Sequence, residues 1–244
     1  MLDKGGINVV FIIIFVLAAL LEIIFVPLFL KASWPDRCWK SLGYKMICAS
    51  LFLIAGLCCI LYSGGFTKYA RLMFLGLLFG ALGDLLIHFI TKKAIINVFG
   101  GVAFFVGHIF YIAAFFSVLS EINPQARLFN LWSVVATLVY VAAYLCFAYL
   151  KKVKIGVLTV PVIFYALMIV TMLMSAIKLA LSIGTVGAYC TLLLGAALFV
   201  SSDTTLSLFT FGGEKFRKKG LKNFYIITYF LAQFLLGASV VFVK

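Results

Sequence analysis

FGALGDLLIHF (residues 79–89) and LGAALFVSSDTTLSLF (residues 194–209) are apolar runs of the kind that crosses a membrane, and each carries one aspartate. The chain is 66% hydrophobic and has only 7 acidic residues, so acids inside such runs are not accidents of composition. A carboxylate at membrane depth costs about 2.5 to 3.5 kcal/mol on insertion scales and therefore faces the protein interior. Because such residues mark proton paths, ion sites or catalytic groups, we expect Asp84 and Asp203 to carry the function.

The overall composition predicts an all-α integral membrane protein. Its mean hydropathy is +1.23, and 11% of its residues are charged. Since one transmembrane helix needs about 20 mostly apolar residues, the sequence predicts a bundle of about eight such helices. The first apolar segment is too long for the core of a signal peptide, so it is expected to be a retained helix. We expect a single polytopic membrane domain over residues 1–244, with helices at about 7–30, 41–62, 69–90, 95–119, 128–150, 156–180, 184–211 and 222–243.

The positive charges predict how the chain is oriented in the membrane. The net charge is +13, but the cations are spread through loops instead of forming a basic domain, so no nucleic-acid partner is expected. With the predicted helices, most of the 20 Lys and Arg residues fall on the side that holds the loop GGEKFRKKGLK, residues 212–222. The positive-inside rule then predicts that this loop is cytoplasmic and that both termini are on the other side. The loop is also expected to contact anionic membrane lipids.

The two aspartates are predicted to lie at one depth. At a rise of about 1.5 Å per residue, Asp84 and Asp203 both lie roughly 10 Å from the predicted cytoplasmic ends of their helices. Glu22 has a similar position in the first helix. Two carboxyl groups in a low-dielectric site do not both ionise cheaply, so the pair is expected to share a proton. This arrangement suits general acid–base catalysis and equally a proton-coupled transporter.

Further polar residues lie inside the predicted helices. His108 is in the middle of FFVGHIFYIAAF, with Tyr111 three residues further on. In YIITYFLAQF, Tyr229 and Gln233 are four residues apart and share one helix face. These side chains either contribute to the site of the two aspartates or only join helices by hydrogen bonds.

Small residues are expected to have structural roles. The hydroxyl of Ser202, beside Asp203, can donate to the carboxylate or to a helix carbonyl. The 6 cysteines show no metal-binding pattern and are expected to pack as small apolar residues. Close helix packing is expected at Gly56, Gly76, Gly80, Gly83 and Gly195.

Four stretches together resemble one family of membrane enzymes, the YhhN-type lysoplasmalogenases. LGDLL, FFVGHIFYIAAF, GAALFVSSDTTLSLF and YIITYFLAQ occur in the family's order and spacing, and the resemblance covers essentially the full chain. Lys45 resembles the family's lysine at the start of the second helix, with Met46 where proline is usual. The resemblance implies hydrolysis of the vinyl ether bond of lysoplasmalogen to a fatty aldehyde and a glycerophospho-base. It implies a plasma or inner membrane in a bacterium, where the substrate could differ, and the endoplasmic reticulum in an animal.

The residues suit this chemistry. Vinyl ether hydrolysis begins with protonation of the β-carbon, which generates an oxocarbenium ion, and glycosidases handle such an ion with two carboxyl groups. We therefore expect Asp84 and Asp203 to divide the roles of acid and base, in either order, without a metal or cofactor. A lysophospholipid would enter sideways from the bilayer. The predicted substrate-binding residues are Glu22, Lys45, Ser202, His108, Tyr111, Tyr229 and Gln233, with Lys45 meeting the phosphate.

Other functional classes also use intramembrane carboxylates. A proton-coupled transporter or flippase of a lipid or small amphiphile is the main alternative, although the predicted helices lack pairs broken by Pro or Gly, and there are only 4 prolines. An intramembrane aspartyl protease is disfavoured, because Gly80 and Gly83 do not form its G-x-G-D signature with Asp84. A purely structural protein would leave two acids at equal depth unexplained.

Overall fold

The structure is a computed structural model that describes residues 4–88, 94–153 and 155–243. Within these ranges it has 8 helices that are long and apolar enough to cross a membrane, which confirms the predicted all-α bundle of a multi-pass membrane protein. The helices are α1 (Lys4–Ala32), α2 (Trp39–Tyr62), α3 (Lys68–His88), α4 (Ala94–Ile122), α5 (Leu131–Leu150), α6 (Thr159–Ile183), α7 (Val186–Ala188), α8 (Leu194–Phe211) and α9 (Lys219–Ala238).

Short segments of other helix types extend three of the spans. The 3-10 helix η1 (Gly156–Leu158) precedes α6, and η3 (Ser239–Val241) follows α9. The π-helix η2 (Tyr189–Leu193) joins α7 to α8, so that the seventh span is one continuous helical rod.

The boundary between the sixth and seventh spans has a clear local cause. Gly184 has φ 70°, a left-handed conformation that is typical of the residue that ends a helix. The next residue, Thr185, caps the following helix by accepting a hydrogen bond from the Ala188 amide at 3.3 Å. These two residues explain why a nearly unbroken apolar stretch forms two spans.

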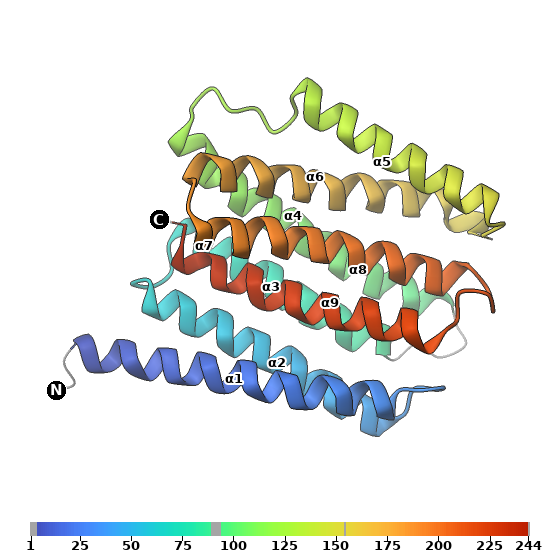
Figure 1. Ribbon diagram of the computed structural model, residues 1–244, viewed down its shortest axis with the longest axis horizontal. Helices are drawn as coiled ribbons and strands as arrows, with labels where there is room; N and C mark the ends of the chain where they lie inside the picture. The colour runs from blue at the N-terminus through green and yellow to red at the C-terminus, as the bar shows by residue number, and fades with distance from the viewer. Residues whose placement is uncertain (1–3, 89–93, 154, 244) are drawn as a thin grey trace.

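The spans run up and down side by side, and both termini lie at the same end of the bundle (Figure 1). α9 packs against α8, α2, α1 and α3. It is the most buried span at 67%, whereas the first span is only 17% buried. α3 and α8 run in the same direction, so their C-terminal parts lie together at the end of the bundle away from the termini (Figure 1). Asp84 and Asp203 are therefore at the same end, as their predicted depth requires.

Glycines allow α3 to approach the helices that carry the polar residues. A Cβ atom on Gly76 would lie 2.3 Å from the ring of Tyr111, and one on Gly80 would lie 2.3 Å from the Gln233 amide nitrogen. Real Cβ atoms do not come so close, so an added methyl group would displace the Tyr111 ring at Gly76 or the end of the Gln233 side chain at Gly80. The predicted close packing is confirmed at these two residues.

Gly76→Ala is expected to lower the thermal stability of the purified protein in detergent. The added methyl group would displace the fully buried Tyr111 ring, and such overpacking costs about 1–3 kcal/mol. The matched control is Gly101→Ala, because a Cβ atom at Gly101 meets nothing within 4 Å. Equal melting temperatures for the two variants would show that the contact at Gly76 does not constrain the bundle.

The orientation in the membrane is open to a direct test. An epitope tag after the C-terminus is expected to be accessible from the non-cytoplasmic side of sealed membranes, because the positive-inside rule places both termini on that side. A tag inserted at Gly213, in the connection between α8 and α9, should react only after permeabilisation. The reverse pattern of labelling would contradict the charge-based topology.

Candidate active site

One cavity contains both aspartates. It lies toward the end of the bundle that carries the α1–α2 and α8–α9 connections, and it is lined by Asp84 of α3 and Asp203 of α8. The cavity has a volume of about 40 Å³ and opens outward. Much of the wall is apolar and consists of Phe29, Ile87, Phe104, Leu206, Ile226 and Phe230. The cavity therefore combines carboxyl groups with a surface that suits a hydrocarbon chain.

Both oxygens of Asp84 are occupied. The Lys45 ammonium from α2 forms an ion pair with Oδ1 at 2.9 Å, and the Tyr229 hydroxyl from α9 donates to Oδ2 at 2.9 Å. Lys45 Nζ also donates to the Asp84 main-chain carbonyl at 3.2 Å. Asp84 is only 2% exposed, so these contacts replace the water that the carboxylate would otherwise need.

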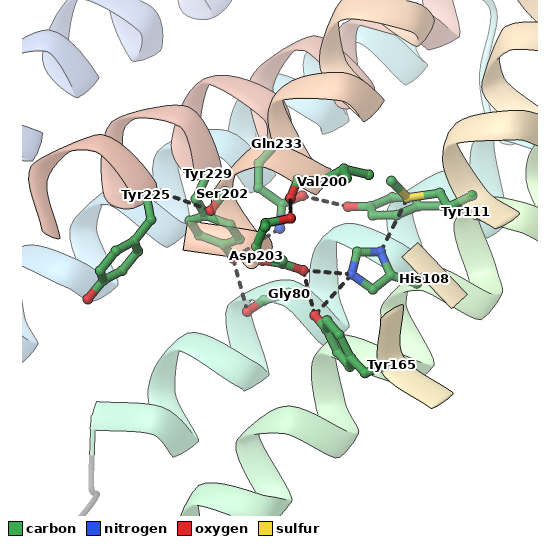
Figure 2. A network of polar contacts seen from close by, with 12 residues as sticks. Gly80, His108, Tyr111, Tyr165, Val200, Ser202, Asp203, Tyr225, Tyr229 and Gln233 are labelled. Carbon is green, nitrogen blue, oxygen red and sulfur yellow. Dashed lines mark hydrogen bonds and ion pairs between the residues drawn. The ribbon is translucent and has the colours of Figure 1, made fainter. Parts of the chain in front are cut away.

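Tyr229 is held in place by a chain of hydrogen bonds behind it. The Gln233 amide nitrogen donates to the Tyr229 hydroxyl at 3.0 Å, and Gln233 Oε1 accepts from the Tyr111 hydroxyl at 2.6 Å. Gln233 is completely buried, and Tyr111 is 1% exposed. Figure 2 shows both side chains on the far side of Tyr229 from Tyr225. The structure thus places Tyr111 and Gln233 where they orient Tyr229, outside the cavity wall.

Asp203 has different surroundings. Its Oδ2 accepts a hydrogen bond from the Tyr165 hydroxyl of α6 at 2.6 Å and lies 3.2 Å from His108 Nε2 of α4. The three side chains form a compact triangle in Figure 2. His108 Nδ1 lies 3.2 Å from the Met172 sulfur, and its ring packs edge-on to Phe199. His108 therefore lies behind Asp203 and touches the carboxyl group that lines the cavity.

Two other predicted residues are placed differently. Ser202 lines the cavity, but its hydroxyl donates to the Tyr225 carbonyl at 2.8 Å and so joins α8 to α9. Glu22 is 8% exposed and does not line the cavity. Its carboxyl group lies beside the Cys48 thiol of α2, and neither oxygen forms a well-aligned hydrogen bond within the described chain.

The structure adds three residues that the sequence did not single out. Tyr165 contacts Asp203, and the cations Arg37 and Lys222 line the cavity. From the sequence, Arg37 and Lys222 were only two of many loop cations, and Tyr165 was one tyrosine in an apolar span. Among the described residues, no group of three or more His, Cys, Asp and Glu is placed to hold a metal ion.

Comparison with known proteins identifies the family. No curated protein and no solved structure matches the chain significantly. The sequence model of the YhhN family matches residues 40–240. This match covers most of the chain, from the start of α2 through η3, and includes both aspartates of the cavity. The chain therefore belongs to the YhhN family.

Proposed function

We propose that this protein is an intramembrane hydrolase that cleaves the vinyl ether bond of a lysoplasmalogen, producing a fatty aldehyde and a glycerophospho-base. The observation that carries the proposal is the meeting of two buried carboxyl groups, Asp84 and Asp203, in one cavity with apolar walls. Membership of the YhhN family, whose motifs the sequence carries, supports the same reaction. The apolar walls suit the single hydrocarbon chain of the substrate.

The contacts of the two carboxyl groups support different roles. Asp84 is paired with the Lys45 ammonium, which stabilises it as a carboxylate. That carboxylate would stabilise an oxocarbenium ion and accept a proton from water. The contacts of Asp203 with Tyr165 and His108 fall on Oδ2, and among the described residues no hydrogen bond engages Oδ1. Oδ1 is therefore the oxygen left to exchange a proton with the substrate.

The proposed reaction balances with one water molecule. Asp203 transfers its proton to the β-carbon of the vinyl ether, and the α-carbon becomes part of an oxocarbenium ion. Asp84 takes a proton from water as the water oxygen bonds to the α-carbon, which forms a hemiacetal. The hemiacetal then collapses: Asp84 protonates the departing glycerol oxygen, and Asp203 takes the hydroxyl proton as the aldehyde forms. Both carboxyl groups return to their starting states.

One observation favours the alternative of a proton-coupled transporter. Asp84, Tyr229, Gln233 and Tyr111 form a continuous chain of hydrogen bonds that leads from the cavity toward the other end of the bundle. Proton paths in transporters run along buried polar side chains, with a carboxylate such as Asp84 as the group that takes up the proton. The two functions are distinguished in sealed vesicles, where only a transporter would couple a proton flux to the presence of a lysolipid.

Asp84→Asn and Asp203→Asn are expected to lower aldehyde release from lysoplasmalogen by at least about 100-fold, the usual range for general acid–base groups. The assay uses purified full-length protein in detergent, and a saturated lysophospholipid of equal chain length should release no aldehyde. The control is Glu121→Gln, which replaces an exposed acid outside the cavity wall. Near-native turnover by either folded Asp variant would exclude the two-carboxylate mechanism.

Tyr165→Phe is expected to lower kcat by about 10-fold to 100-fold, because it removes a hydrogen bond to a reacting carboxyl group that is worth about 1.5–3 kcal/mol. KM should change little, since the Tyr165 hydroxyl touches Asp203 and does not line the cavity. The matched control is Tyr140→Phe, whose hydroxyl bonds to Thr204 beside Asp203. Equal kcat values for the two variants would show that Tyr165 does not tune Asp203.

A further inference from the structure

Two cations line the cavity without a part in the proposed reaction. Arg37 comes from the connection between α1 and α2, and Lys222 comes from the first turn of α9. Lys45, the third cation of the wall, is paired with Asp84. Within the described residues, neither Arg37 nor Lys222 has a carboxylate oxygen within 4.0 Å. The cavity therefore holds positive charge that its own carboxylates do not pair.

Lys222 occupies an unfavourable place for a cation. It is only 5% exposed, yet an ammonium group has three N–H donors to satisfy. Its described partners are the Ser33 carbonyl, to which it donates, and the ring of Trp34, 5.5 Å from Nζ to the centroid. Moreover, the first turn of a helix carries positive partial charge, which disfavours Lys there. An anion at this place would relieve both penalties.

Arg37 completes the arrangement at the outer part of the cavity. It is exposed, and one of its N–H groups donates to the Ile87 carbonyl near the end of α3. This contact and a hydrogen bond to the Tyr225 hydroxyl hold the guanidinium beside the cavity, and they use only part of its five N–H donors. The neighbouring Asp36 attracts Lys222 electrostatically but forms no ion pair with it at hydrogen-bonding range. A planar guanidinium with spare donors is well suited to bind a phosphate.

We propose that Arg37 and Lys222 form an anion-binding subsite that takes the phosphate of a single-chain phospholipid. A lipid phosphate fits better than a free phosphate, because apolar residues such as Phe29, Phe104 and Phe230 line the same cavity. The vinyl ether and the single chain of this lipid rest on the proposed function, whereas the phosphate and an apolar chain are inferred from the residues that line the cavity.

This subsite also changes the expected position of the substrate. The sequence predicts Lys45 as the residue that meets the phosphate, but the structure places its ammonium on Asp84. With the phosphate on Arg37 and Lys222, Lys45 remains free to stabilise the carboxylate. The glycerol unit would then extend from Arg37 and Lys222 toward Asp84 and Asp203.

A binding experiment tests the subsite without relying on turnover. The full-length protein in detergent micelles is loaded with a fluorescent lysophosphatidylcholine. Two competitors of equal chain length then displace this probe: a non-hydrolysable 1-O-alkyl-glycerophosphocholine, which carries the phosphate, and a 1-O-alkylglycerol, which lacks it. Arg37→Gln and Lys222→Met should each weaken binding of the phosphate-bearing lipid by about 10-fold to 100-fold, as expected for the loss of a charge-assisted hydrogen bond. Binding of the alkylglycerol should be unchanged in both variants. It is measured directly from the fluorescence of a labelled alkylglycerol.

Matched variants separate charge from folding. Lys219→Met removes an exposed cation from the same helical turn and should bind both lipids like the unmodified protein. Lys222→Arg should retain most of the preference for the phosphate-bearing lipid, because it keeps the charge. A loss of both lipids in Lys222→Met and Arg37→Gln would indicate a structural role and overturn the proposal, as would unchanged binding of both.

Soluble competitors identify the source of the phosphate. Inorganic phosphate and glycerophosphocholine at millimolar concentration are expected to displace the fluorescent lipid poorly, because neither contacts the apolar walls. Displacement by inorganic phosphate as effective as by the alkyl lysolipid would assign the site to a free anion and overturn the lipid assignment. If the protein shows this lipid preference but releases no aldehyde, the subsite stands and the proposed hydrolysis fails, so the two proposals are judged separately.

Discussion

A charged group in the apolar interior of a membrane bundle needs a partner, and this requirement governs how three helices meet around Asp84. The carboxylate on α3 receives an ammonium from α2 and a hydroxyl from α9. Without the ammonium, the Asp84 carboxylate would be an unpaired charge in a low-dielectric interior. Without the hydroxyl, one of its oxygens would lack a hydrogen bond, and both losses are strongly unfavourable. The interaction therefore both satisfies Asp84 and fixes the relative rotation of α2, α3 and α9.

The position of Tyr229 shows how the apolar packing supports this polar contact. Its ring lies edge-on to Phe52, Phe104 and Phe199, with centroid distances of 6.5, 5.7 and 5.5 Å. These aromatic pairs come from α2, α4 and α8, so four helices hold one side chain. Because Gly80 has no side chain, Gln233 can approach α3 and hold the Tyr229 hydroxyl. The hydroxyl that reaches Asp84 is consequently held with little freedom.

The two carboxyl groups of the cavity differ because they have different neighbours. Asp84 is paired with a cation, whereas Asp203 contacts a phenol and an imidazole. A pair of acids in unlike surroundings is the usual way in which one protein provides both an acid and a base. The proposed anion subsite would orient a bound lipid, because a phosphate held by Arg37 and Lys222 would present the rest of the lipid to the two carboxyl groups.

Much of the fold and part of the candidate site could be predicted from the sequence. Apolar segments of membrane length predicted the eight spans, and the position of Asp84 and Asp203 within their segments predicted a common depth. Family motifs marked His108, Tyr229 and Gln233, each of which contacts an aspartate or supports a residue that does. Hydropathy and spacing along one helix hold this information, because span length and depth are properties of consecutive residues.

Tertiary structure alone decided that Lys45 pairs with Asp84, that Tyr165 reaches Asp203 and that Lys222 is buried beside the cavity. These contacts depend on how separate helices rotate and cross, which no local pattern encodes.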